Sequence, residues 1–260
     1  MTPSTTLRSN SFNPRALLRH AGVFAFYVAL WALAAQAVGQ PLLLPTPLSV
    51  GQKLLSLLPQ ASFYQTLAAT MGRTLLSYVL GILAAVLLGM LCCRYALADT
   101  LLSPLLSAVR ATPVTSFIVL ALVWLSAANV PVLTGFLMTL PVVYTALVTA
   151  VRSVDTRLLE MASLYGLGRA GTLRHIWLPA VRPALIDSCL SAIGLCWKAV
   201  VAAEVIGVPK RAVGSRLYEA KIYLETDSLL AWTLTIVLLS VLLEQLLRRI
   251  AGRYAEVRHD

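Results

Sequence analysis

Charged residues are scarce in this chain. Only 12% of its 260 residues are Asp, Glu, Lys or Arg, whereas 58% are hydrophobic. A water-soluble globular domain carries about twice that share of charge, so the composition excludes one. The apolar residues form long runs, and a membrane-spanning helix needs about 20 of them. The sequence therefore predicts an all-α polytopic helix bundle in a membrane, with roughly five to seven spans for a chain of this length.

The sequence also lacks the motifs of several enzyme classes. It has no Gly-rich phosphate loop followed by Lys and Ser or Thr, so we expect this chain not to hydrolyse ATP itself. Its three histidines are far apart, and the apolar runs contain no His/Glu cluster and no Ser/His/Asp set. We therefore assign no catalytic residue and no metal site. No inverted repeat is recognisable either, which argues against a secondary transporter.

Cysteine is rare, and its four positions do not suit disulfides. Cys92 and Cys93 are adjacent, while Cys189 and Cys196 are seven residues apart in one apolar run. Seven helical residues rise roughly 10 Å, which exceeds the Cα separation that a disulfide allows. We interpret these cysteines as small packing residues.

Positive charge exceeds negative charge, giving a net charge of +10. The Lys and Arg residues are spread through the connections and form no continuous stripe, so we exclude nucleic acid as a partner. Fourteen of them, Arg110 included, fall in connections on one side of the membrane and five on the other. The positive-inside rule places the richer side in the cytoplasm, together with both termini. Arg73 would join the outer group if its side chain snorkels outward.

Six apolar runs define the expected topology. We predict spans at residues 21–38, 66–91, 114–125, 132–151, 184–205 and 229–247. The third run is short, so we expect a preceding interfacial helix within residues 93–113 to complete that crossing. Four prolines within residues 40–59 exclude a continuous membrane helix there. A short amphipathic helix at residues 47–58, lying on the outer interface, is the alternative that we predict.

These runs divide the chain into one membrane domain and two tails. We predict a cytoplasmic tail at residues 1–20, a transmembrane domain at residues 21–250 and a second cytoplasmic tail at residues 251–260. The run at residues 21–38 is too long and too aromatic for the core of a cleavable signal peptide, so we interpret it as an uncleaved first span. A cytoplasmic loop at residues 152–182 connects the fourth span to the fifth.

The most polar part of that loop, EMASLYGLGRAGTLRHIWLP, is basic and interrupted by glycines. Apolar residues recur at helical spacing on either side of Gly166 and Gly168, and glycine is costly inside a helix but tolerated in a turn. This pattern predicts two short helices that meet at the glycines. Pro179 indicates a second break near the start of the next span.

The spacing of Glu160, Ala162 and Gly166, followed by an aliphatic-x-Leu-Pro ending, resembles the EAA loop of ABC importer permeases. The match departs from that family's pattern only at Met161, where the first Ala is expected. An ordinary cytoplasmic loop is the alternative. The resemblance implies a type I ABC importer permease fold with six transmembrane helices, in which the helix after Glu160 docks on an ATP-hydrolysing subunit. The residues that it implies for this coupling are Glu160, Ala162, Gly166, Gly168, Ile176, Leu178 and Pro179.

Three further stretches, LLPTPLSV, RSVDTRLLE and AAEVIG, resemble the nitrate/sulfonate/taurine branch of these permeases. The resemblance implies import of a small anion such as a sulfonate, taurine or nitrate across a bacterial inner membrane. A thiamine-precursor pyrimidine or another small organic molecule is the alternative solute. The resemblance also implies a pair of ATP-binding subunits that bind ATP and Mg, an extracytoplasmic binding protein and a second permease copy. No cofactor is expected in this chain.

The fifth predicted span contains three charges, Asp187, Lys198 and Glu204. A charge within a bilayer is costly and faces a partner or water, so Lys198 is our candidate for the translocation path. Asp187 lies on nearly the same helix face but roughly 16 Å away, and Glu204 lies on a different face. A structural role, in which Lys198 snorkels or pairs with an acid on another helix, stays open.

Overall fold

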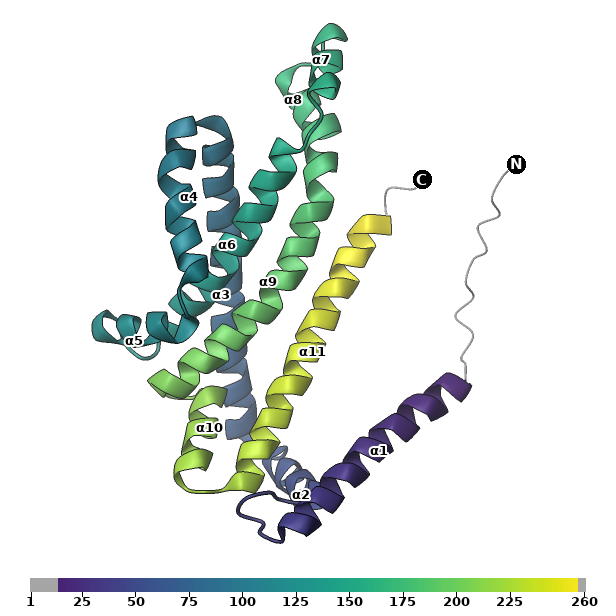
Figure 1. Ribbon diagram of the computed structural model, residues 1–260, viewed down its shortest axis with the longest axis vertical. Coiled ribbons are helices and arrows are strands. Elements are labelled where there is room, and N and C mark those ends of the chain that lie inside the picture. The colour runs from purple at the N-terminus through teal and green to yellow at the C-terminus, as the bar shows by residue number, and fades with distance from the viewer. Residues whose placement is uncertain (1–13, 257–260) are drawn as a thin grey trace.

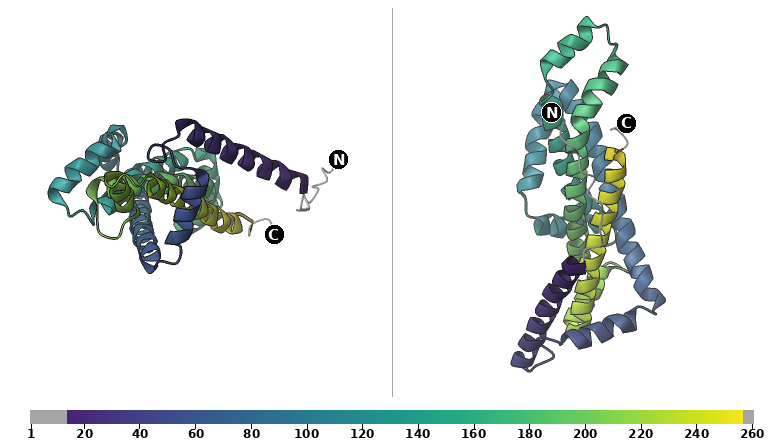
Figure 2. Two further views of the ribbon diagram at one scale, coloured as in Figure 1. Left: turned by 90° about the horizontal axis from the view of Figure 1, so that it is seen from below. Right: turned by 90° about the vertical axis from the view of Figure 1, so that its right-hand side faces the viewer.

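The computed structural model describes residues 14–256, and every regular element within that range is a helix. Figures 1 and 2 show an elongated bundle of long helices. Two short helices, α7 Thr156–Leu164 and α8 Arg169–Thr172, project at one end of it. Two others, α2 Pro47–Leu57 and α10 Val213–Ile222, lie at the opposite end. The all-α bundle predicted from the apolar runs is confirmed.

The centre of the bundle consists of α3 Ala61–Arg94, α6 Val130–Arg152 and α9 Leu178–Gly207. These helices approach closely because small residues line the contacts. A Cβ added at Gly81 of α3 would lie 2.6 Å from the Thr139 Cβ of α6, and one at Gly135 of α6 would lie 2.5 Å from the Ser77 Oγ of α3. Without a hydrophobic driving force in lipid, such close packing of small residues is what holds helices together.

The segment before the predicted third span forms a helix, and its position at the membrane interface stays a prediction. Helix α4 Ala96–Ala111 runs back along α3, and α5 Val114–Trp124 then turns across the bundle at 105° to it (Figure 1). Pro113 explains the bend, because a residue before proline avoids the helical region and Thr112 is extended, with ψ 132. The 11 residues of α5 are too few to cross a bilayer alone.

By length and composition, four described helices can each cross a membrane, or five crossings result if the bent α4–α5 pair counts as one. The four comprise α3, α6, the helix ending in α9, and α11 Thr226–Glu256. Helix α1 Pro14–Val38 diverges from the bundle, and its described apolar part, Gly22–Val38, is shorter than a typical span (Figure 2). The chain is therefore multi-pass, and the count of six spans stays a prediction.

The helix break predicted at Pro179 is wrong. Residues Arg169–Gly207 form one continuous helical stretch, which contains a π-helical turn at Leu173–Trp177. The Leu178 N–H bonds the Leu173 carbonyl, five residues earlier instead of four. This wider turn comes just before Pro179, which has no N–H to donate, so the helix passes the proline by changing register instead of ending.

Candidate functional site

The segment between α6 and α9 begins with a capped helix. α7 starts directly after Asp155, whose carboxylate accepts the N–H of Arg157 at 2.9 Å. A side chain that accepts an N–H of the first turn is the usual way to start a short helix, which has few hydrogen bonds of its own. Glu160 is exposed on this helix, whereas Ala162 is only 1% exposed.

Gly166 ends α7 in a left-handed conformation, with φ +67°. The Leu167 N–H bonds the Ala162 carbonyl at 2.9 Å, and the Gly166 N–H bonds the Ser163 carbonyl at 3.2 Å. This pair of bonds is a Schellman motif, which requires a residue at positive φ and therefore favours glycine. The predicted turn at the glycines and the short helix before it are confirmed, whereas the helix after them is the start of the long stretch Arg169–Gly207. Gly168 comes next, in an extended conformation with φ −64° that any residue can adopt.

The tip of this hairpin is apolar and unpartnered within residues 14–256. Leu164 and Tyr165 are 86% and 80% exposed, and they sit directly before the Gly166 turn. Further along, Leu178 is exposed, while Ile176 and Pro179 are half-buried. The motif residues Ala162 and Gly166 therefore supply the packing and the turn, and the neighbouring large side chains supply the exposed surface. Leu164 was not predicted from the sequence, although its position two residues before Gly166 places it beside the predicted turn.

Lys198 is exposed on α9 and has no ion-pair partner among the residues that the structure describes. Ser191 and Asp187 are exposed on the same face of α9, about two and three helical turns from Lys198. Because the single chain leaves this face open, the candidate for the translocation path and its structural alternative both remain to be tested.

Arg73 and Glu204 form an ion pair that sequence reasoning missed. The Arg73 guanidinium of α3 donates to the Glu204 carboxylate of α9 at 2.8 Å, and the Glu204 side chain is 0% exposed. The carboxylate also accepts the Thr70 hydroxyl at 2.9 Å and the Gly214 N–H at 3.2 Å. Arg73 also donates to the carbonyl groups of Lys210 and Arg211, so its guanidinium reaches the connection between α9 and α10. The sequence did contain a signal for this pair, because two of the apolar runs each carry one of two opposite charges.

A groove of about 710 Å³ runs along α6 and α9 and is bordered by Arg110 of α4. Its polar members are Arg110, Thr145, Thr149, Ser153, Asp187, Ser188 and Ser191. Arg110 was grouped with Arg152 on one side of the membrane, and the structure corrects this. Asp99, in the first turn of α4, pairs with Arg152 at 2.7 Å, whereas Arg110 lies in the last turn of that helix. Arg110 therefore lies away from that end of α4, and its exposed side chain borders the groove.

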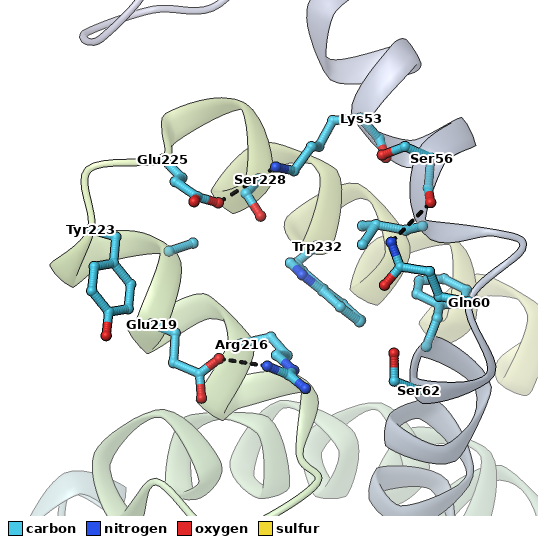
Figure 3. A pocket seen from close by; sticks show the side chains of 13 residues that line it. Lys53, Ser56, Gln60, Ser62, Arg216, Glu219, Tyr223, Glu225, Ser228 and Trp232 are labelled. Atoms are coloured by element: carbon cyan, nitrogen blue, oxygen red, sulfur yellow. Dashed lines mark hydrogen bonds and ion pairs between the residues drawn. The ribbon is translucent and has the colours of Figure 1, made fainter.

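A smaller pocket of about 350 Å³ lies at the α2 and α10 end (Figure 3). Trp232 is one wall, and two ion pairs cross or border the space. Lys53 and Glu225 are 3.5 Å apart, and Arg216 and Glu219 are 2.8 Å apart. The charges of this pocket thus neutralise one another, in contrast to Arg110 and Lys198.

Known proteins resemble this chain in sequence. The family model described as "Binding-protein-dependent transport system inner membrane component" matches residues 77–256. The taurine transport system permease protein TauC of Escherichia coli (strain K12) is 28% identical over 86% of this chain and 83% of that protein. The putative aliphatic sulfonates transport permease protein SsuC of the same strain is 27% identical over 89% and 90%. The riboflavin transport system permease protein RibX of Chloroflexus aurantiacus is 27% identical over 85% and 86%.

Solved structures share the fold. An amino acid ABC transporter crystallised with histidines has a TM-score of 0.58 at 14% identity, covering 73% of this chain and 92% of that one. An inward-facing form of the MetNI methionine ABC transporter has a TM-score of 0.51 at 18% identity, covering 75% and 93%. With the family match across the bundle and the exposed hairpin between two of its spans, the chain belongs to the binding-protein-dependent transport system inner membrane components, as the membrane-spanning permease subunit of an ABC importer.

Proposed function

We propose that this permease forms the translocation path for a small organic or inorganic anion, with a sulfonate such as taurine as the leading candidate and nitrate as another. Permeases of this family work with an ATP-binding subunit and a solute-binding protein. In the arrangement we propose, a second copy of this chain completes the path and a pair of ATP-binding subunits hold ATP and Mg. The chain itself hydrolyses no ATP and holds no cofactor. It lies in a bacterial inner membrane, with both termini and the α7–α8 hairpin in the cytoplasm.

The observation that carries this proposal is the α7–α8 hairpin. Its exposed apolar tip at Leu164 and Tyr165 directly precedes the turn in which Gly166 adopts a positive φ. An exposed apolar patch rimmed by polar residues marks a protein contact. Because α6 leads directly into the hairpin and α9 continues from it without a break, movement of a bound partner would be transmitted to both central helices. Glu160, Ala162, Gly168, Ile176, Leu178 and Pro179 are proposed to shape this contact together with Gly166.

Uptake by reconstituted vesicles tests the assignment. Proteoliposomes that contain the permease, its ATP-binding subunit and its binding protein are expected to accumulate radiolabelled taurine when ATP is enclosed with the ATP-binding subunit. A non-hydrolysable ATP analogue is the control and should abolish uptake. Uptake driven by a proton or sodium gradient without ATP would instead indicate a secondary transporter.

A neutral or heteroaromatic solute is the second candidate, and the similarity to a riboflavin permease favours it. A thiamine-precursor pyrimidine belongs to the same class. The vesicle assay separates the two candidates if riboflavin and a pyrimidine are offered beside taurine.

Lys198 is proposed to line this path. We expect Lys198→Met to lower taurine uptake about tenfold, because an anion loses a favourable charge within the membrane. Lys198→Arg should retain part of the uptake, since the charge is kept. Lys221→Met is the matched control, because Lys221 is exposed on α10, away from the α6–α9 face, and should leave uptake unchanged. Normal transport by Lys198→Met, or failure of that variant to assemble, would make the residue structural.

A further inference from the structure

Arg110 is exposed at the edge of the α6–α9 groove, part-way along the bundle. It follows Asp99 by eleven residues in α4, a rise of roughly 16 Å. Its partner Thr145 precedes Arg152 by seven residues in α6, roughly 10 Å. The Asp99–Arg152 pair joins the same two helices at one end of both, so the contact between Arg110 and Thr145 lies well inside that end.

The guanidinium of Arg110 is largely uncommitted. It donates one hydrogen bond to the Thr145 hydroxyl at 3.1 Å, and Thr145 gives its own proton to the Pro141 carbonyl at 2.7 Å. The threonine oxygen can therefore only accept from Arg110 and contributes no charge. A guanidinium has five N–H donors, so four are free to bind an oxyanion. No acid of the described chain lies within ion-pair distance of Arg110.

The surroundings leave this positive charge unneutralised. Of the two carboxylates that line the cavities beside Arg110, Asp99 is occupied by Arg152 at 2.7 Å, and Asp187 has no ion pair with Arg110. The remaining uncharged polar neighbours are the hydroxyls of Ser103, Ser107, Tyr144, Thr145, Thr149, Ser153, Ser188 and Ser191. A free cation at membrane depth is costly unless water or an anion reaches it.

We propose that Arg110 is an oxyanion-binding residue of the translocation path, which holds the sulfonate or a chemically similar anionic group of the solute in the α6–α9 groove. A planar guanidinium binds such groups through two parallel hydrogen bonds, and the Thr149 hydroxyl borders the same space. The inference rests on the proposed function in assigning this groove to the solute. Lys198 lies two helical turns beyond Ser191 on the same side of α9, so it lies farther along α9 than the part that lines this groove.

The electrostatic effect of the Arg110 charge on the groove can be measured without knowing the solute. Thr149→Cys is introduced in a chain whose four native cysteines are replaced by alanine, and the full-length permease is purified with its ATP-binding subunit in lipid nanodiscs. The probes are a methanethiosulfonate reagent that carries an ethylsulfonate and one that carries a trimethylammonium group. Thr149 lies one turn from Thr145, roughly 6 Å, so the ratio of anionic to cationic labelling rates reports the potential beside Arg110.

We expect Arg110→Gln to lower this rate ratio about tenfold, and Arg110→Lys to change it less than threefold, because only the former removes the charge. Arg174→Gln, on the exposed hairpin outside the groove, is the matched control and should not change the ratio. If Arg110→Gln fails to fold, the ratio of labelling rates in the chain that keeps Arg110 still tests the inference. Thr149→Cys should favour the anionic probe about tenfold more than Ser126→Cys, which lies in the α5–α6 connection.

Two outcomes overturn the inference. A cysteine at position 149 that reacts with neither probe means that water does not fill the groove. An equal ratio with and without the Arg110 charge means that anions do not sense it. Both results leave the importer assignment intact. Conversely, if wild-type vesicles accumulate no taurine while the rate ratio falls as expected, the anion site stands and the proposed solute is wrong.

Discussion

Glu204→Gln is expected to lower the free energy of unfolding by about 3 kcal/mol, measured by denaturant titration of the purified permease in detergent micelles. The glutamine can still accept the bonds from Thr70 and Gly214, but it leaves the Arg73 guanidinium without a carboxylate at a site where Glu204 is fully buried. Removing one partner of a buried pair leaves an uncompensated charge, which costs far more than the pair itself contributes.

A matched exposed pair is the control. Glu219→Gln breaks the Arg216–Glu219 pair, whose side chains are both more than one third exposed, and should change stability by no more than about 0.5 kcal/mol. The double variant Arg73→Gln with Glu204→Gln should lose less stability than the sum of the two single variants, since neither charge is then left alone. Equal losses for Glu204→Gln and Glu219→Gln would show that the buried pair is not a structural contact.

Gly166→Leu is expected to abolish ATP-dependent uptake while the chain still inserts into the membrane. At φ +67° a side chain costs about 1–2 kcal/mol, and the strain falls on the turn that ends α7. A hairpin that relaxes to negative φ redirects Leu164 and Tyr165, so the proposed docking surface is lost. The measurements are taurine uptake, ATP hydrolysis stimulated by the loaded binding protein, and the yield of co-purified ATP-binding subunit.

Gly168 provides the control two residues further on. Neither glycine has a neighbour within 4 Å of an added Cβ, so Gly166→Leu and Gly168→Leu differ in backbone conformation and not in available space. Gly168→Leu should therefore retain much more ATP-dependent uptake than Gly166→Leu. Gly166→Asn should show intermediate uptake, because asparagine tolerates positive φ. Normal uptake and a normal yield of the ATP-binding subunit with Gly166→Leu would refute the coupling role of this turn.

Two prolines show how differently the same residue can act in this chain. Pro179 was expected to end a helix, but a π-helical turn at Leu173–Trp177 lets the helix continue. Pro113 was expected at the entry to the third apolar run, and α5 does begin directly after it, at an angle of 105° to α4. Proline restricts one residue and removes one donor, and whether the chain bends or changes register there depends on what the neighbouring helices can pack against.

The sequence by itself determined the features that depend on local chemistry. Long apolar runs specify membrane helices because a bilayer leaves the backbone no other partner, and Gly166 specifies the hairpin turn because few other residues adopt positive φ there. Only the tertiary structure decided which charges meet. Arg73 and Glu204 are 131 residues apart and pair because α3 and α9 cross at that depth, whereas Arg110 faces an open groove because α4 ends beside α6. Periodicity along one helix defines its faces, but the neighbour of each face is set by how the helices pack in three dimensions.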